Sequence, residues 1–223
     1  HIFGTDIFGR DTFIRAVVGT KVSLQLSLLT LIIQIPLGMV LGAFAGYFGG
    51  IIDDIIFFIM SVLQAIPGLL LLMSFILVMG RSFLVIAVAF AITGWIGLAR
   101  TLRGLFFSAR EFEYVMAAKA LGANDSRIIF KHIIPNVFNY LVISVILNIV
   151  SIVMSEVTLA FLGLTVVGVP TWGIMISDSG LELAAGNWQN LIASGIVMFI
   201  FIMALNLFGD VLIDSIDPRL RNS

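Results

Sequence analysis

The chain has 223 residues, of which 60% are hydrophobic and only 11% are charged. Because a soluble domain keeps about a quarter of its residues charged, this composition predicts a protein surrounded largely by the lipid bilayer. The net charge of −1 provides no basic excess for binding nucleic acid, and the lack of cysteine excludes disulfides and thiolate metal ligands.

Five apolar stretches are long enough for a helix to cross the hydrocarbon core, which takes about 20 residues. They cover residues 22–47, 55–80, 82–99, 137–164 and 191–209. Residues 1–21 form a polar N-terminal segment, residues 100–136 a charged loop, and residues 165–190 a loop containing Trp172 and Trp188. We therefore expect an all-α, polytopic transmembrane helical bundle.

The loop charges predict the orientation, because lysine and arginine gather on the cytoplasmic side. The loop 100–136 contains Arg100, Arg103, Arg110, Lys119, Arg127 and Lys131. With this loop in the cytoplasm, the C-terminal tail lies there too, and residues 1–21 and 165–190 are extracytoplasmic. Five spans leave the first residue outside, so a further helix upstream would restore a cytoplasmic N-terminus.

Glycine and proline indicate how the spans pack. Gly38, Gly42, Gly46 and Gly50 recur at every fourth residue, which predicts a smooth helix face for close packing in lipid, or less readily a substrate lining. Pro36 and the pair Pro67–Gly68 predict bends, because proline removes a backbone hydrogen bond and clashes with the preceding turn.

The charged loop contains the signals of two short helices. Ser108 and Glu111 have the spacing of a capping box for the first helix, and Gly122 is placed to end it in the left-handed conformation. Within that helix one apolar stripe is expected, formed by Tyr114, Ala117, Ala118 and Leu121.

Asn124 or Asp125 is expected to cap the second helix, Pro135 to close it, and Asn136 to cap the fourth span. Together the two helices are expected to form an elbow, residues 108–136, that fits into a groove of a partner protein.

The elbow resembles the "EAA" loop of ABC-importer permeases, whose pattern is E-A-A, three residues, G, nine residues and I-x-L-P. Ala117, Ala118, Gly122 and Pro135 match that spacing, while Met116, His132 and Ile134 replace the Glu, Ile and Leu of the pattern. Because Met116 replaces the carboxylate, we expect docking here to rest on shape and apolar contact. The residues expected to dock on an ATPase are Glu113, Tyr114, Met116, Ala117, Ala118, Leu121, Gly122, Ala123 and Pro135.

Other segments resemble the dipeptide/oligopeptide/nickel permeases, and most closely their C-type subunit. They are the GTD-x-x-GRD pattern at residues 4–11, Gly46–Asp53, Arg127–Asn136, Phe161–Leu164, Trp172–Gly173, and Gly209–Asp210 with Asp217–Arg219. In this family one more helix normally precedes the first span seen here. The resemblance implies a type I ABC-importer permease in a bacterial or archaeal cytoplasmic membrane, with its C-terminus in the cytoplasm.

The resemblance also implies the partners: a second homologous permease, two cytoplasmic ATPases that bind ATP and Mg²⁺, and an extracytoplasmic binding protein that delivers the substrate. No cofactor is expected in this chain, and it has no G-x-x-x-x-G-K-[ST] phosphate loop, so it is expected not to be an enzyme. Its two histidines, His1 and His132, are too far apart in sequence to suggest a metal site. Di- or oligopeptides are the expected substrate, and chelated nickel or another small solute is the alternative.

Polar residues inside the spans are candidates for a translocation path or gate. Neutral ones are expected either to bond neighbouring helices or to line a wet path, and they are Gln34, Gln64, Asn148, Ser151 and Asn206. Glu156 lies about 30 Å from the cytoplasmic start of its helix, so an anchoring or outer-gate role is expected.

Aromatic and acidic residues near the span ends are expected to have mainly structural roles. Trp172 and Trp188 are expected to anchor at the membrane surface or to contact the delivery protein. The last span is closed by three acids, Asp210, Asp214 and Asp217. Asp210 and Asp214 are one turn apart and are expected to pair with cytoplasmic arginine or lysine.

Two other function classes remain possible from sequence. An aspartyl intramembrane protease needs a G-x-G-D motif and two facing acids, but Leu207 replaces the first glycine before Asp210. A serine protease of this kind needs a histidine inside a span, and none is present. A gradient-driven secondary transporter usually carries buried acids or inverted repeats, and only Glu156 fits that description.

Overall fold

The computed structural model describes residues 2–216, apart from the side chains of Ile213, Asp214 and Ile216. The predicted all-α bundle is confirmed. Its helices are α1 (Thr12–Phe48), α2 (Gly50–Ala65), α3 (Gly68–Met79), α4 (Phe83–Ala109), α5 (Glu113–Ala120), α6 (Asp125–Arg127), the π-helix η1 (Ile128–Ile133), α7 (Ile134–Phe161), α8 (Trp172–Ala184) and α9 (Gln189–Ile216).

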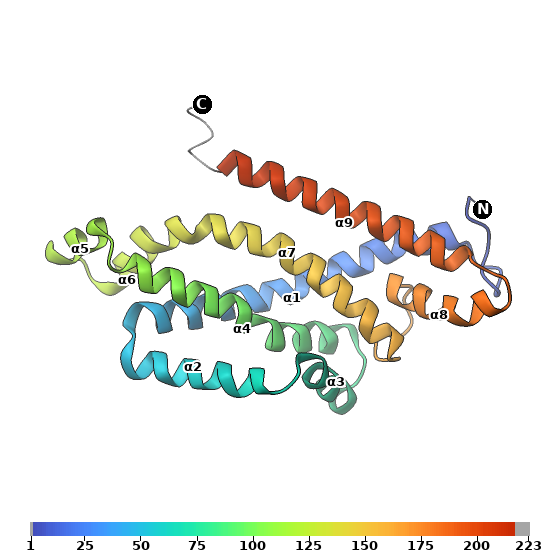
Figure 1. The fold of residues 1–223 in the computed structure, drawn as a ribbon, viewed down its shortest axis with the longest axis horizontal. Coiled ribbons are helices and arrows are strands. Elements are labelled where there is room, and N and C mark those ends of the chain that lie inside the picture. The colour runs from blue at the N-terminus through green and yellow to red at the C-terminus, as the bar shows by residue number, and fades with distance from the viewer. Residues whose placement is uncertain (1, 217–223) are drawn as a thin grey trace.

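The long helices α1, α4, α7 and α9 run along the long axis of the molecule (Figure 1). Helices α5 and α6 lie at one end, and α8 lies at the other end together with the start of α1 (Figure 1). We call these the α5 end and the α8 end. The last turns of α9 lie toward the α5 end, which is the side on which the sequence places the C-terminal tail.

Four helical segments of the described chain are long and apolar enough to cross a membrane: Thr12–Phe48, Phe83–Ala109, Asp125–Phe161 and Gln189–Leu212. The predicted span 55–80 is not one straight helix, because α2 and α3 meet at an angle of 84°. Ile66 is extended, as a residue before proline prefers to be, and α3 starts again after Pro67. The bend was predicted, but the complete break in the helix was not.

Helices α1 and α4 extend well beyond their predicted spans. Helix α1 begins at Thr12 rather than near residue 22, because the Asp11 carboxylate caps it by accepting the Ile14 N–H at 3.0 Å. Helix α4 continues past Arg100 to Ala109. Its arginines find polar partners on α2: Arg100 donates to Gln64, and Arg103 forms a two-pronged ion pair with Asp53. Because both arginines have polar partners, they do not force α4 to end where the apolar stretch ends.

The glycine face of α1 packs directly on α4. A Cβ atom at Gly42 would lie 2.6 Å from the Ala99 carbonyl oxygen, and one at Gly38 would lie 2.9 Å from Leu98. Gly46 meets the Arg103 backbone in the same way. Gly50 was wrongly assigned to this face, because α1 ends at Phe48 and Gly50 begins α2 with open space around it. The chain reverses at Gly49, whose φ of 65° favours glycine.

The N-terminal segment folds around one buried carboxylate. Asp6 is 6% exposed and accepts hydrogen bonds from the Phe8 and Arg10 N–H groups, both at 2.9 Å, and from the Arg10 and Arg15 side chains. Burial acts to raise the pKa of Asp6, but the bonds from Arg10 and Phe8 outweigh it and hold the pKa below its ordinary value.

Candidate functional site

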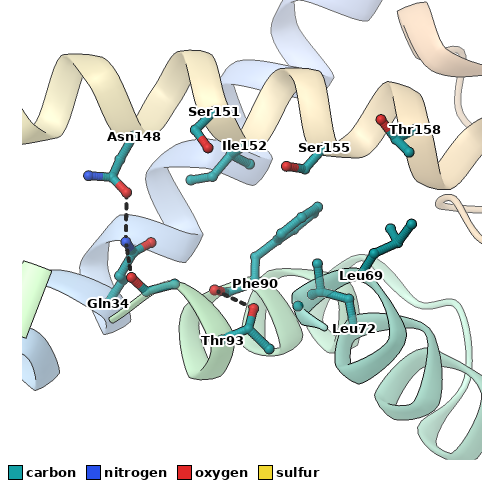
Figure 2. A pocket seen from close by; sticks show the side chains of 12 residues that line it. Gln34, Leu69, Leu72, Phe90, Thr93, Asn148, Ser151, Ile152, Ser155 and Thr158 are labelled. Atoms are coloured by element: carbon teal, nitrogen blue, oxygen red, sulfur yellow. Dashed lines mark hydrogen bonds between the residues drawn. The ribbon is translucent and has the colours of Figure 1, made fainter. Parts of the chain in front are cut away.

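A cavity of about 390 Å³ lies among α1, α3, α4 and α7, beside the break between α2 and α3 (Figure 2). It combines polar groups from α7 with apolar groups from α3 and α4. Its lining residues are Gln34, Gly68, Leu69, Leu72, Phe90, Thr93, Gly94, Asn148, Ser151, Ile152, Ser155 and Thr158.

The polar wall of the cavity is one face of α7. Asn148, Ser151, Ser155 and Thr158 follow each other at intervals of three or four residues, which places them on the same side of a helix. Phe90 and Leu72 lie on the opposite wall (Figure 2). The cavity therefore offers neutral hydrogen-bonding groups on one side and apolar surface on the other.

Gln34 joins three helices at one end of the cavity. Its Nε2 donates to Asn148 Oδ1 at 2.8 Å and to the Gly94 carbonyl at 3.1 Å (Figure 2). Gly94 makes room for this amide, because a Cβ atom there would lie 3.0 Å from the Gln34 side chain. Gln34 and Asn148 thus combine the two roles considered for them, since they bond neighbouring helices and also line the cavity.

Three of the predicted path residues lie elsewhere. Gln64 accepts a hydrogen bond from Arg100, and Asn206 is exposed on α9, where it donates to the Ile202 carbonyl at 2.9 Å. Glu156 is buried outside the lining. Conversely, sequence reasoning missed Ser155 and Thr158, although their spacing from Ser151 was visible and could have identified them.

Glu156 fixes the α8 end of the molecule to α7. It is 1% exposed, and its Oε1 accepts hydrogen bonds from Thr165 Oγ1 at 2.5 Å and Thr171 Oγ1 at 2.7 Å. Gly173 packs against its other oxygen so closely that a Cβ atom would lie 2.9 Å away. This geometry fits an anchoring role, because one carboxylate holds both sides of the loop that precedes α8.

The expectation for Trp172 was wrong. The side chain is completely buried, and its Nε1 donates to the Ala16 carbonyl on α1 at 2.8 Å. It therefore contacts neither the membrane surface nor a delivery protein, and instead joins α8 to α1. Trp188 is 50% exposed and stays available for either expected role. Asp210 forms no ion pair with any described residue, while the Asp214 side chain and Asp217 lie outside the described part of the chain.

The first helix of the elbow begins later than predicted. Ser108 lies in the last turn of α4, so the capping box with Glu111 does not form, and α5 starts after Phe112 without a side-chain cap. Val115, 2% exposed, anchors α5 to the core. Gly122 ends the helix as predicted, with φ at 83° and a bond of 3.0 Å from the Ala123 N–H to the Ala118 carbonyl.

The second helix continues where an end was predicted. Asn124 caps α6 by accepting the Arg127 N–H at 2.8 Å, as expected. Pro135 does not close the helix, because the π turn η1 leads directly into α7 and Pro135 lies in the first turn of α7, where proline is tolerated. Asn136 is no cap either, since its Nδ2 donates to the His132 carbonyl at 2.6 Å and to Tyr114 Oη at 3.1 Å.

The outer face of the elbow is apolar and uncovered. Leu121 is 89% exposed, Met116 54% and Tyr114 41%, while Ala118 and Ala123 are partly buried. The other predicted docking residues, Glu113, Ala117, Gly122 and Pro135, are also exposed. Tyr47 Oη donates to Asp125 Oδ1 at 2.7 Å and so ties the elbow to the end of α1.

Residues 38–222 match the family described as "Binding-protein-dependent transport system inner membrane component". The chain belongs to this family. The permease is 36% identical to the oligopeptide transport system permease protein OppC of Bacillus subtilis, covering 99% of this chain and 72% of that protein. It is 36% identical to the dipeptide transport system permease protein DppC of the same organism, covering 99% of this chain and 69% of that protein. It is 33% identical to the glutathione transport system permease protein GsiD of Pectobacterium atrosepticum, covering 100% of this chain and 74% of that protein.

The fold of this permease is also found in a solved transporter. An inward-facing structure of the MetNI methionine ABC transporter superposes with a TM-score of 0.71, covering 92% of this chain and 96% of that chain. At 17% identity the likeness shows the fold alone, which is the predicted fold of an ABC-importer permease. The permease is thus a multi-pass membrane protein.

Proposed function

We propose that this permease is one of two path-forming subunits of an ATP-driven importer of di- and oligopeptides, working by alternating access. The uncovered apolar face of the elbow carries the proposal, because such a surface on a small helix needs a partner. The relatives at 36% identity, named for oligopeptide and dipeptide transport, support the substrate class.

The proposed assembly has a second permease, two ATP-binding subunits and an extracytoplasmic binding protein. ATP and Mg²⁺ are bound and ATP is hydrolysed on the partner subunits, and this chain has no catalytic role. The lack of a phosphate-loop motif in the sequence supports this division.

The orientation that fits this role places the α5 end and the C-terminus in the cytoplasm. Arg110 and Lys119 lie at the elbow, as the rule for cytoplasmic cations requires. The Glu156 contacts then lie at the extracytoplasmic side, where they hold α8 against the bundle.

The test is peptide uptake by the reconstituted complex of both permeases, both ATPases and the binding protein. We expect uptake of a labelled dipeptide that requires ATP and is lost in Ala118→Arg, whose bulky cation blocks docking while the chain still inserts in the membrane. Ala184→Arg, at an exposed alanine of α8, is the matched control and keeps ATPase association. Uptake by this chain alone, driven by an ion gradient, would overturn the proposal, and ATP-dependent uptake of a nickel chelate instead of peptide would change the substrate.

A further inference from the structure

The wall of the cavity on α7 is polar but uncharged. Asn148, Ser151, Ser155 and Thr158 present amide and hydroxyl groups, and none of the described lining residues is charged. Hydroxyl and amide groups can donate and accept hydrogen bonds, so they do not favour a ligand charge of either sign.

Two of these hydroxyls are free. Serines in lipid usually bond a carbonyl of their own helix, and Ser61, Ser74 and Ser144 each do so at 2.8 Å. Ser151 and Ser155 form no hydrogen bond with any residue that the structure describes, and both line the space between α7 and α4 (Figure 2). Both hydroxyls are therefore available to form hydrogen bonds with a ligand in the cavity.

The size of this wall suits an extended peptide. From Asn148 to Thr158 the helix rises about 15 Å, at 1.5 Å per residue. An extended chain advances about 3.3 Å per residue, so this length spans roughly four or five residues. The main chain of a peptide alternates donors and acceptors, and a hydroxyl can pair with either. The apolar wall formed by Phe90 and Leu72 then lies beside the peptide side chains.

We propose that Ser151 and Ser155, between Asn148 and Thr158, hold a passing peptide through its main-chain amide groups. The wall recognises the peptide backbone and is indifferent to side-chain charge, so cationic and anionic peptides pass alike. This inference rests on the proposed peptide import and assigns specificity-determining residues within it.

Charge placed on the wall tests this directly. In the reconstituted complex, wild type is expected to take up Lys-Ala-Lys and Glu-Ala-Glu with similar catalytic efficiency at saturating binding protein. Ser155→Asp should favour the cationic over the anionic peptide by about fivefold, and Ser155→Lys should reverse that preference, because one charge pair in a wet site changes the rate by about that factor. Thr101→Asp and Thr101→Lys, at an exposed α4 position outside the cavity, are the matched controls and should produce no preference.

The outcomes separate the two proposals. If wild type imports both peptides but the Ser155 variants show no opposite preference, the assignment of the wall is wrong while peptide import stands. If the wild-type complex imports neither peptide with ATP, the proposed function itself fails.

A labelling experiment covers the case in which a charged variant does not insert. Because the chain has no cysteine, a single Ser151→Cys or Ser155→Cys change gives it one thiol. Each thiol should react with a water-soluble reagent in the assembled complex and be protected by the tripeptide during transport. Thr101→Cys should show no such protection. Unreactive thiols at both serines, or labelling that peptide does not slow, would overturn the inference.

Discussion

The two ends of this permease differ in how they hold their acidic side chains. At the α8 end, three acids are almost completely buried, and each has partners within the chain: Asp6 with Arg10, Glu156 with two threonines, and Glu182 with Asn190 at 2.9 and 3.0 Å. At the α5 end, by contrast, no described acid is buried. Large apolar side chains are exposed at both ends, Leu121 and Met116 on the elbow and Leu181 on α8 among them.

The difference shows which end is complete by itself. Burying an acid is costly unless neighbouring groups compensate, so the contacts at the α8 end must form whenever the chain folds. A contiguous apolar patch on a short surface helix instead marks a site where another molecule binds. The acids of the α8 end thus have their partners within the chain, whereas the apolar face of the elbow is the surface that we propose binds the ATPase subunits.

The largest effect is expected from charging the exposed face of the elbow. Leu121→Asp should weaken association with the ATPase subunits by about tenfold or more, because an aspartate replaces an apolar contact in the partner's groove. Leu181→Asp makes the same change at an equally exposed leucine of α8 and should keep association near wild type. Binding of the purified ATPase subunits to each variant in nanodiscs measures the effect. Equal losses of binding in the two variants would show that the elbow is not the docking surface.

The next largest effect is expected at Glu156. Glu156→Leu leaves the buried hydroxyls of Thr165 and Thr171 without their acceptor and should lower the free energy of unfolding by about 2–4 kcal/mol. Glu156→Gln keeps an acceptor oxygen and should lose less than about 1 kcal/mol. Thermal unfolding in detergent provides the comparison. A Leu variant as stable as the Gln variant would show that the α8 end does not depend on this carboxylate.

A smaller effect is expected where the elbow joins α1. Tyr47→Phe removes the hydroxyl that bonds Asp125 and should loosen α6 by about 0.5–1 kcal/mol, the usual net value of one hydrogen bond near the surface. Hydrogen exchange of the α6 amides should accelerate while that of α8 stays unchanged. Accelerated exchange at both ends would mean that the two ends unfold together.

The smallest effect is expected from acid at the α8 end. The pKa of Asp6 lies below its ordinary value of 3.8, so its stabilising contribution is complete above pH 3.8 and is lost as the pH falls through the lower, folded-state value. Exchange of the Phe8 and Arg10 amides should therefore accelerate only in that acidic range. In Asp6→Asn the acceleration should be present already at neutral pH and should not change with acid.

The sequence predicted those features that depend on local chemistry. Hydropathy located four long apolar helices and the stretch 55–80, which the structure breaks into α2 and α3. The glycine at position 122 and the asparagine at position 124 identified a helix end and a helix start that the structure confirms. Local rules failed where a distant group decides the outcome. Trp172 resembles a membrane-surface tryptophan until the Ala16 carbonyl on α1 supplies a buried acceptor. Pro135 indicates a helix end, but the preceding π turn leads the chain into α7 without a break.

The candidate cavity was only partly predictable for the same reason. Gln34 and Asn148 are conspicuous as amides inside apolar spans, yet their pairing depends on the close approach of Gly94, which is visible only in three dimensions. Ser155 and Thr158 were overlooked because hydroxyl residues are common in membrane helices and usually bond their own backbone.

The continuity of the helix from Asp125 to Phe161 has a mechanical consequence. These 37 residues form one helical segment about 55 Å long, interrupted only by the wider turn of η1. Its residues 125–136 belong to the elbow, its middle forms the polar wall, and Glu156 lies near its far end. We therefore expect a partner that displaces the start of this segment to act on the same helix that carries the polar wall. The helix that carries the cavity wall and Glu156 is thus continuous along the chain with the elbow that we propose binds the ATPase subunits.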